Sequence, residues 1–273
     1  MGTDYVHGYT THETRRLTDQ AETLAGLLHA GTTYPPGARV LEVGCGVGAQ
    51  TVQLVTANPG IRLVSVDLSE DSLAQAKARV AAAAPYAEVE WHHGDLRDLP
   101  FEDGSFDHLF VCFVLEHLAD PEGVLRQLRR LVRPGGDITV IEGDHDSAFH
   151  HPRSTAAQSL IDCLTDLQAE AGGDALIGRR VQPLLQAAGY HDVRTRPCTV
   201  YADETLPHLV DGFIRKTFIA MVESVRERAL AAGLRTPDEW RRGIRDLERA
   251  AEPGGTFHYT FFKAVALIPE GAG

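Results

Sequence analysis

The stretch VLEVGCGVG, residues 40–48, decides the fold of this chain. It starts as a short apolar run and continues into three alternate glycines, Gly44, Gly46 and Gly48, followed by apolar residues at helical spacing. This pattern predicts a buried strand, a tight turn and a helix. Glycines in such a turn allow positive φ and let a ligand approach bare backbone, while the helix that follows points free N–H groups at it. A nucleotide-like ligand fits this geometry.

The glycine spacing alone leaves the kind of nucleotide open. Gly44, Gly46 and Ala49 also satisfy the G-x-G-x-x-G/A pattern of dinucleotide-binding proteins, so a nicotinamide cofactor is one alternative. Glu42 favours a different ligand, because a carboxylate at the end of the strand attracts positive charge. S-adenosylmethionine carries such charge on its ammonium and sulfonium groups.

An acidic residue followed by G-x-G-x-G resembles the first motif of the class I S-adenosylmethionine-dependent methyltransferases. The likeness is to the methyltransferase-11 type, which includes enzymes of ubiquinone and menaquinone biosynthesis. It implies S-adenosyl-L-methionine as cofactor, S-adenosyl-L-homocysteine as product, and cofactor contacts from Glu42, Gly44 and Gly46.

Composition and charge narrow the class of protein. The 273 residues are 43% hydrophobic and 23% charged, which is typical of a globular α/β protein. The formal net charge of −12 disfavours a nucleic acid as substrate. Four cysteines without C-x-x-C spacing and the absence of an apolar leader favour the cytoplasm, and no apolar run is long enough to predict a membrane span.

Residues 1–34 are expected to form a helical lid. An amphipathic pattern places Leu17 and Leu24 on one helix face, behind an aromatic lead. By the family resemblance, Tyr9, Arg16 and Gln20 contact the methionine end of the cofactor and Tyr5 covers the substrate. The alternative is that Arg16 and Gln20 belong to the solvated side of the helix.

Acidic residues follow the next two predicted strands. The run 61–66 ends in Asp67, and a carboxylate at that position accepts hydrogen bonds from ribose hydroxyls in nucleotide-binding folds. The alternative for Asp67 is a charge at the N-terminus of the next helix, with Ser69 as its cap. In the family, the residue after this aspartate lies against adenine and a later aspartate accepts from the adenine amino group. These roles fall to Leu68, Asp95 and Leu96, and Cys112 is expected in the cofactor-side wall.

The order of predicted elements defines the fold. Strands at 39–43, 61–66, 89–92, 108–113 and 137–142 alternate with helices, which predicts a Rossmann-like, doubly wound parallel sheet. Two more strands, 193–201 and 256–268, complete seven, and the resemblance implies that the last is antiparallel and lies beside the fifth. The chain is thus divided into a lid (1–34), a Rossmann-like core (35–203), a helical cap insertion (204–253) and a final core strand (254–273).

The segment 142–152, expected as a loop after the fifth strand, carries three carboxylates and three histidines. A metal site is one interpretation, but adjacent His150 and His151 lack helical ligand spacing, so no metal is expected. The preferred interpretation makes His145 or Asp144 a general base that takes a proton from the methyl acceptor. Another is that the acidic residues cap the following helix and the histidines lie on the surface. Glu142 and His145 are also candidate substrate contacts.

Aromatic residues predict the type of substrate. If those of the lid, the 142–152 segment, the insertion and the last strand converge, they form an apolar pocket for a hydrophobic small molecule. The set is Tyr5, Tyr9, Phe149, Phe213, Phe257 and Tyr259. We expect methylation of carbon or nitrogen in a small aromatic acceptor of specialised metabolism. Overall likeness to bacterial indole C-methyltransferases suggests an indole.

Two other functions remain compatible with the sequence. One is a nicotinamide-dependent oxidoreductase, and the other is a protein that binds S-adenosylmethionine without catalysis. The cap insertion is long enough to roof a pocket or to build the interface of a homodimer.

Overall fold

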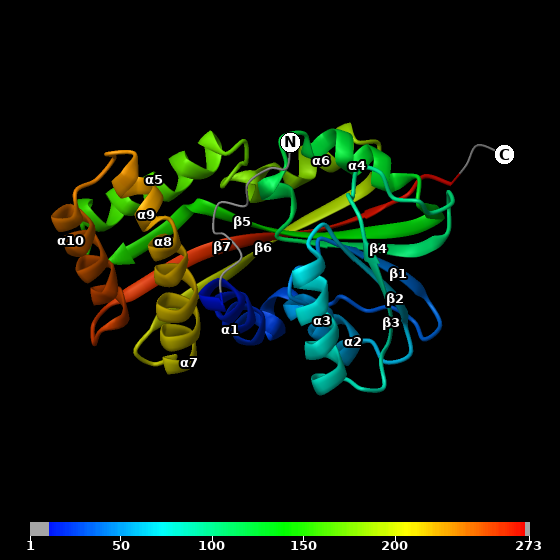
Figure 1. The fold of residues 1–273 in the computed structure, drawn as a ribbon, viewed down its shortest axis with the longest axis horizontal. Helices are drawn as coiled ribbons and strands as arrows, with labels where there is room; N and C mark the ends of the chain where they lie inside the picture. The colour runs from blue at the N-terminus through cyan, green and yellow to red at the C-terminus, as the bar shows by residue number, and fades with distance from the viewer. Residues whose placement is uncertain (1–10, 271–273) are drawn as a thin grey trace.

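The computed structural model describes residues 11–270, and its centre is a seven-stranded sheet in the order β3-β2-β1-β4-β5-β7-β6 (Figure 1). Neighbouring strands from β3 to β5 are parallel, whereas β7 is antiparallel to both β5 and β6. The expected Rossmann-like sheet with an inserted antiparallel last strand is therefore confirmed. The strands are β1 (Arg39–Val43), β2 (Arg62–Asp67), β3 (Glu88–His93), β4 (Phe106–Cys112), β5 (Val132–His151), β6 (His191–Asp203) and β7 (Thr256–Leu267).

Helices cover both faces of the sheet (Figure 1). Alternate residues of a strand point to opposite faces, so Val40 and Leu41 of β1 belong to different hydrophobic clusters. Helices α1 (Thr11–Leu28), α2 (Ala49–Ala57) and α3 (Glu70–Ala83) lie on one face, and α4 (Pro121–Arg129) and α6 (Val181–Ala187) on the other. The short 3-10 turns η1 (Leu115–His117) and η2 (Ile177–Arg180) follow β4 and precede α6.

The remaining helices gather at the far end of the long strands β5, β7 and β6 (Figure 1). They are α5 (Thr155–Glu170), α7 (Pro207–Leu209), the π-helix η3 (Val210–Ile219), α8 (Ala220–Ser224), α9 (Arg226–Ala231), α10 (Pro237–Glu248) and η4 (Arg249–Ala251). Thr236 and Glu239 form a capping box that starts α10. Helix η3 packs on α1, and α10 packs on α5.

Strand β5 is much longer than the sequence predicts. The expected strand ended at residue 142 and a loop followed, but β5 continues to His151 because β7 pairs with it up to Asp144 and again from Phe149 to His151. A shift in register between Asp144 and Phe149 interrupts the pairing, which resumes with Phe149 opposite His258. The expectation of a loop at 142–152 is wrong, and side chains there alternate between two sheet faces instead of gathering in one place.

A buried lysine fixes the end of α1 to the sheet. Lys263 of β7 is 2% exposed, and its Nζ donates to the carbonyl oxygens of Leu28 at 3.0 Å and Ala30 at 2.9 Å and to Thr32 Oγ1. A cation at the C-terminus of a helix satisfies carbonyl groups that have no partner within the helix. This contact positions α1 beside the carboxyl ends of the parallel strands.

Candidate functional site

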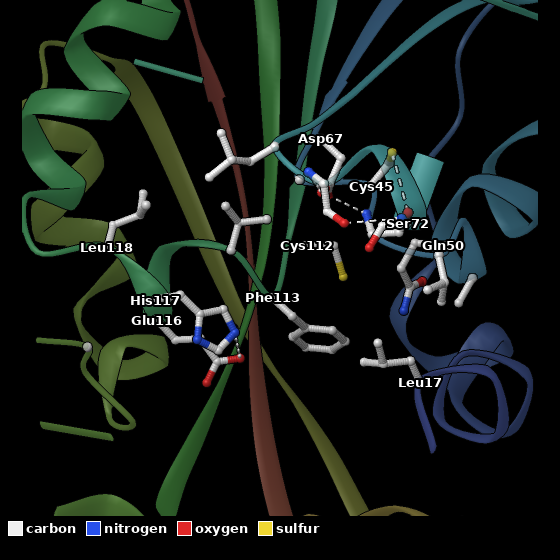
Figure 2. Close-up of a pocket in the computed structure, with 18 of the residues that line it drawn as sticks. Leu17, Cys45, Gln50, Asp67, Ser72, Cys112, Phe113, Glu116, His117 and Leu118 are labelled. Carbon is white, nitrogen blue, oxygen red and sulfur yellow. Dashed lines mark hydrogen bonds and ion pairs between the residues drawn. The ribbon is translucent and has the colours of Figure 1, made fainter. Parts of the chain in front are cut away.

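A cavity of about 830 Å³ opens at the carboxyl ends of the parallel strands (Figure 2). Residues of α1, the glycine turn, the ends of β2 and β4, β5, η3 and β7 line it. Open α/β sheets bind ligands at this edge, and the volume is in the range of small-molecule sites. The cavity is large enough for a nucleoside ligand together with a second small molecule.

The glycine turn forms one wall of the cavity. Gly44, Gly46 and Gly48 have φ values of 68°, 52° and 76°, in the left-handed region that favours glycine. A Cβ on Gly48 would lie 2.8 Å from the backbone of Ala76, whereas a Cβ on Gly46 would meet nothing within 4 Å. Because Gly46 also lines the cavity, its backbone faces open space that a ligand can fill.

Asp67 connects this turn to the end of β2. Its Oδ2 accepts the backbone N–H of Gly46 at 2.7 Å, and its Oδ1 accepts that of Ser69 at 2.9 Å (Figure 2). Burial raises the pKa of Asp67, although the backbone N–H groups act in the opposite direction. Ser69 caps α3, so Asp67 itself is left at the cavity.

The residues expected around adenine also line the cavity. Leu68 is 55% exposed, and Asp95, Leu96 and Cys112 lie in the same wall. The Asp95 carboxylate pairs with Arg97, which lowers the pKa of Asp95. These placements bring the expected cofactor residues together around one space.

Helix α1 contributes Arg16 and Gln20 to the cavity wall. Both side chains are buried, so the alternative that they form the solvated side of the helix is wrong. Arg16 pairs with Glu13 at 2.6 Å and donates to Gln20 Oε1 at 3.1 Å. The expected contacts from Tyr5 and Tyr9 lie outside the described residues.

Glu42 does not reach the cavity. It is buried behind the turn, where the hydroxyls of Thr51 and Ser65 donate to its Oε2 at 2.8 and 2.7 Å. Burial raises the pKa of Glu42 to about 7. The expectation that Glu42 contacts the cofactor directly is therefore wrong, because its side chain does not line the cavity and instead links β1 to α2 and β2.

Three residues that were expected to act as general base or to contact the substrate lie outside the cavity, because β5 continues as a strand. Glu142 Oε1 accepts the backbone N–H groups of Val114 and Leu115 at 3.0 and 2.7 Å, behind the cavity wall. Asp144 pairs with Arg179 at 2.7 Å. Phe149 is 60% exposed and stacks on His258, with ring centroids 4.1 Å apart. Their expected roles as base or substrate contacts are corrected to structural ones.

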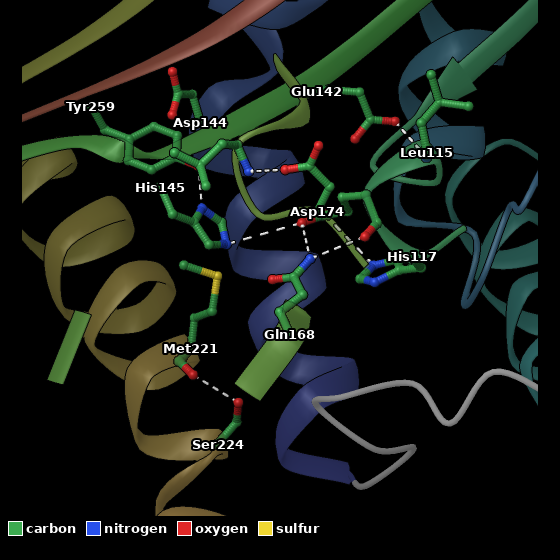
Figure 3. Close-up of polar contacts among 12 residues, drawn as sticks. Leu115, His117, Glu142, Asp144, His145, Gln168, Asp174, Met221, Ser224 and Tyr259 are labelled. Atoms are coloured by element: carbon green, nitrogen blue, oxygen red, sulfur yellow. Dashed lines mark hydrogen bonds and ion pairs between the residues drawn. The ribbon is translucent and has the colours of Figure 1, made fainter. Parts of the chain in front are cut away.

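His145, in contrast, points into the cavity. It is buried, its Nδ1 lies 2.6 Å from Tyr259 Oη, and its Nε2 lies 4.0 Å from Glu116 Oε2 (Figure 3). Burial lowers the pKa of His145, so its imidazole is neutral near pH 7. The Oε2 of Glu116 also accepts from Gln168 Nε2 at 2.9 Å.

Glu116 and Gln168 were missed by sequence reasoning. Glu116 comes from the short turn η1 after β4, and Gln168 from α5, and both line the cavity. The position of Glu116 directly beyond a strand end was the available signal. The sequence contains no such signal for Gln168, because its side chain reaches the cavity only through the packing of α5.

Aromatic side chains form the wall beside this polar group. Phe213 lies 5.6 Å from Tyr259 and 5.9 Å from Phe261 between ring centroids, and all three line the cavity. The convergence of Phe213 and Tyr259 is thus confirmed, whereas Phe257 packs behind them and Phe149 is remote. Phe113 has a φ of 58°, unusual for a residue with a Cβ, and its ring projects into the cavity (Figure 2).

Within residues 11–270, no three His, Cys, Asp or Glu side chains are arranged to hold a metal ion. In the same residues, no helix has the length and apolar character needed to cross a membrane.

The geometry of the site suits a nucleotide-like ligand beside a second small molecule, and comparison with known proteins identifies one domain of the chain. Residues 41–140 match the family described as "Methyltransferase domain". Residues 41–140 therefore form a methyltransferase domain of the class I fold, with S-adenosyl-L-methionine as its cofactor.

Three similar proteins extend this finding. An uncharacterised 37.1 kDa protein in transposon TN4556 of Streptomyces fradiae is 33% identical over 79% of this chain and 59% of its own. The 27-O-demethylrifamycin SV methyltransferase of Amycolatopsis mediterranei is 30% identical over 51% of each chain. The Haemonchus contortus phosphoethanolamine N-methyltransferase 2, solved with S-adenosylhomocysteine, shares the fold with a TM-score of 0.57 at 18% identity, over 91% of this chain and 52% of that one. The chain thus spans little more than half the length of the two sequence relatives.

Proposed function

We propose that the protein transfers a methyl group from S-adenosylmethionine to carbon or nitrogen of a small aromatic molecule, such as an indole, in specialised metabolism. One observation carries this proposal. The open backbone of Gly46 and the carboxylate of Asp67 line the same cavity as an aromatic wall that contains the polar side chain of His145. A cofactor and an acceptor can therefore meet inside a single cavity.

The residues of the glycine end fit the cofactor. The turn leaves room for a ligand against the backbone of Gly46, and the N-terminus of α2 follows directly. Asp67 would hold the ribose hydroxyls, and Asp95 with Leu96 would hold adenine. Arg16 and Gln20 would hold the methionine end. When bound, S-adenosylmethionine supplies an electrophilic methyl group on a positively charged sulfur.

The aromatic end suits a planar, largely apolar acceptor. Phe213, Tyr259 and Phe261 offer ring faces and edges, and Met221 adds an adaptable apolar contact. His145 and Glu116 supply polar contacts at one side of this wall. The Amycolatopsis mediterranei relative, named for a rifamycin substrate, supports a small-molecule acceptor.

Alignment is the main contribution that this protein makes to the rate. Methyl transfer requires the nucleophile, methyl group and sulfur to be nearly collinear, and positioning of this kind is worth on the order of 7 kcal/mol or more. Residues of helices α1 and η3 line the cavity and would shield a bound cofactor and acceptor from part of the solvent.

Calorimetric titration with S-adenosylhomocysteine and with NAD tests the cofactor assignment. We expect one molecule of S-adenosylhomocysteine to bind per chain and NAD not to bind. Binding of NAD without binding of S-adenosylhomocysteine would instead favour an oxidoreductase.

A screen with isotope-labelled S-adenosylmethionine and a panel of aromatic metabolites, read by mass, tests the reaction. We expect a labelled methyl group on at least one acceptor and the release of S-adenosylhomocysteine. A protein that binds the cofactor but releases no S-adenosylhomocysteine across the panel would be a binding protein and not a methyltransferase.

A further inference from the structure

The cavity contains a buried hydrogen-bond acceptor that the described residues leave without a donor. Gln168 is 1% exposed, and its Nε2 donates to Glu116 Oε2 at 2.9 Å and to the Glu116 carbonyl oxygen at 3.3 Å. Since the amide nitrogen faces these two acceptors, Oε1 points the other way, and no group in residues 11–270 donates to it. A buried carbonyl oxygen without a hydrogen-bond donor is energetically unfavourable, so we expect a bound ligand to supply the donor.

The contact at His145 Nδ1 bears on which ring nitrogen carries the proton. His145 Nδ1 lies 2.6 Å from Tyr259 Oη, and we assign the Tyr259 hydroxyl as the donor of this hydrogen bond. In the neutral ring the proton then lies on Nε2. This Nε2 has no hydrogen-bond partner in the described chain, and it lies 4.0 Å from Glu116 Oε2. A nitrogen that already carries hydrogen cannot serve as the base.

Of two buried carboxyl groups nearby, Glu116 carries the negative charge. The pKa of Glu116 lies below its ordinary value although burial acts to raise it, and the hydrogen bond from Gln168 and the positive charge of Arg16 act to lower it. Burial and the Glu116 charge raise the pKa of Glu142 well above its ordinary value. Carboxyl groups with pKa values driven apart in this way have separate chemical roles. Only Glu116 of the two lines the cavity.

We propose that Glu116 accepts a hydrogen bond from an N–H of the methyl acceptor and then receives its proton, and that Gln168 Oε1 can accept from a separate donor of a bound ligand. This inference rests on the proposed function and names its substrate class, an aromatic heterocycle that bears an N–H. His145, held by Tyr259, is a positioning residue that presents its Nε2–H toward Glu116.

The step balances without a further reactant. The transferred methyl group forms a bond to the ring nitrogen, or to a ring carbon conjugated with it, as its bond to sulfur breaks. The electron pair of that broken bond stays on sulfur. The N–H proton passes to the Glu116 carboxylate, and the electrons of the N–H bond remain in the ring.

Indole and 1-methylindole are matched probes of this assignment, because they differ only at the ring nitrogen, where a methyl group replaces the hydrogen. Their affinities are measured by NMR titration of the complex with S-adenosylhomocysteine. We expect indole to bind at least about 10-fold more tightly than 1-methylindole, since a hydrogen bond to a charged group is lost in the second. In Glu116→Gln we expect this preference to fall below about 3-fold. The exposed Glu102→Gln is the control and should retain it.

Equal affinity for the two probes, no binding of either, or a full preference in Glu116→Gln would overturn the inference. Binding of S-adenosylhomocysteine separates this failure from failure of the proposed function. Wild type and Glu116→Gln should both bind it, and its loss from the wild type refutes the proposed function itself.

The protonation state of His145 provides a second readout that needs no acceptor. Nitrogen-15 NMR of labelled imidazoles, with the signal assigned by its loss in His145→Gln, should show the Nε2–H form at neutral pH. A neutral ring with its proton on Nδ1 would overturn the assignment of Glu116 as the proton acceptor.

Discussion

Gly46→Ala tests whether the glycine turn contacts a ligand. Gly46 has a φ of 52°, and an alanine in the left-handed region costs about 1–2 kcal/mol. The new Cβ would meet no protein atom within 4 Å, so the variant should fold with only this loss of stability. The methyl group would instead project into the cavity, where the cofactor backbone contact is expected.

Gly37→Ala is the matched control. Gly37 has a φ of 85° and equally open space around a Cβ, but it does not line the cavity. Urea denaturation should show a similar loss of about 1–2 kcal/mol in the free energy of unfolding for both variants.

Calorimetric titration then distinguishes the effect of backbone strain from the loss of a contact with the cofactor. We expect Gly46→Ala to weaken S-adenosylhomocysteine binding at least about 10-fold, or about 1.4 kcal/mol, and Gly37→Ala to leave the Kd unchanged. An unchanged Kd in Gly46→Ala, or an equal loss of affinity in both variants, would refute the assignment of the turn as the cofactor site.

Three further predictions concern buried or cavity-lining charges. Lys263→Met should lower the free energy of unfolding by about 2–4 kcal/mol in urea, because the acceptors at the end of α1 lose their donor; a loss below 0.5 kcal/mol contradicts this. The raised pKa of Glu42, about 7 against an ordinary 4.5, means that the folded protein keeps a proton that the unfolded chain releases, so stability falls as pH rises through this window. The free energy of unfolding of wild type should therefore exceed that of Glu42→Gln by more at pH 5 than at pH 7.5. This difference should shrink by about 1.4 kcal/mol for each pH unit through the window, and an equal difference at both pH values would count against the prediction. Asp67→Ala should weaken S-adenosylhomocysteine binding by about 10- to 100-fold in calorimetry, whereas the exposed Asp98→Ala should not, and similar affinities of the two variants would remove the ribose role.

The fold and the glycine end of the cavity were predictable because their signals are local. The strand, turn and helix at 40–57 are encoded in consecutive residues, and each left-handed glycine follows from the turn itself. Asp67 and Asp95 were placed from positions directly after strands, where the topology of a parallel sheet brings side chains to one edge.

The acceptor end was predicted less well because it depends on contacts between distant segments. The local sequence of residues 142–151 predicts a loop. These residues form a strand because β7, more than 100 residues later in the chain, pairs with them. That pairing turns Asp144 and Phe149 away from the cavity and leaves His145 facing it. Glu116 meets Gln168 across 52 residues of sequence, and no local pattern marks such a pair.

Diffraction from crystals grown with S-adenosylhomocysteine tests the central assignment most directly. We predict that the adenosine lies between Asp67 and Asp95, that the sulfur lies near the glycine turn, and that the sulfur faces the aromatic wall that contains His145. Density for this ligand at any other position, or none at concentrations that saturate related enzymes, would contradict the account.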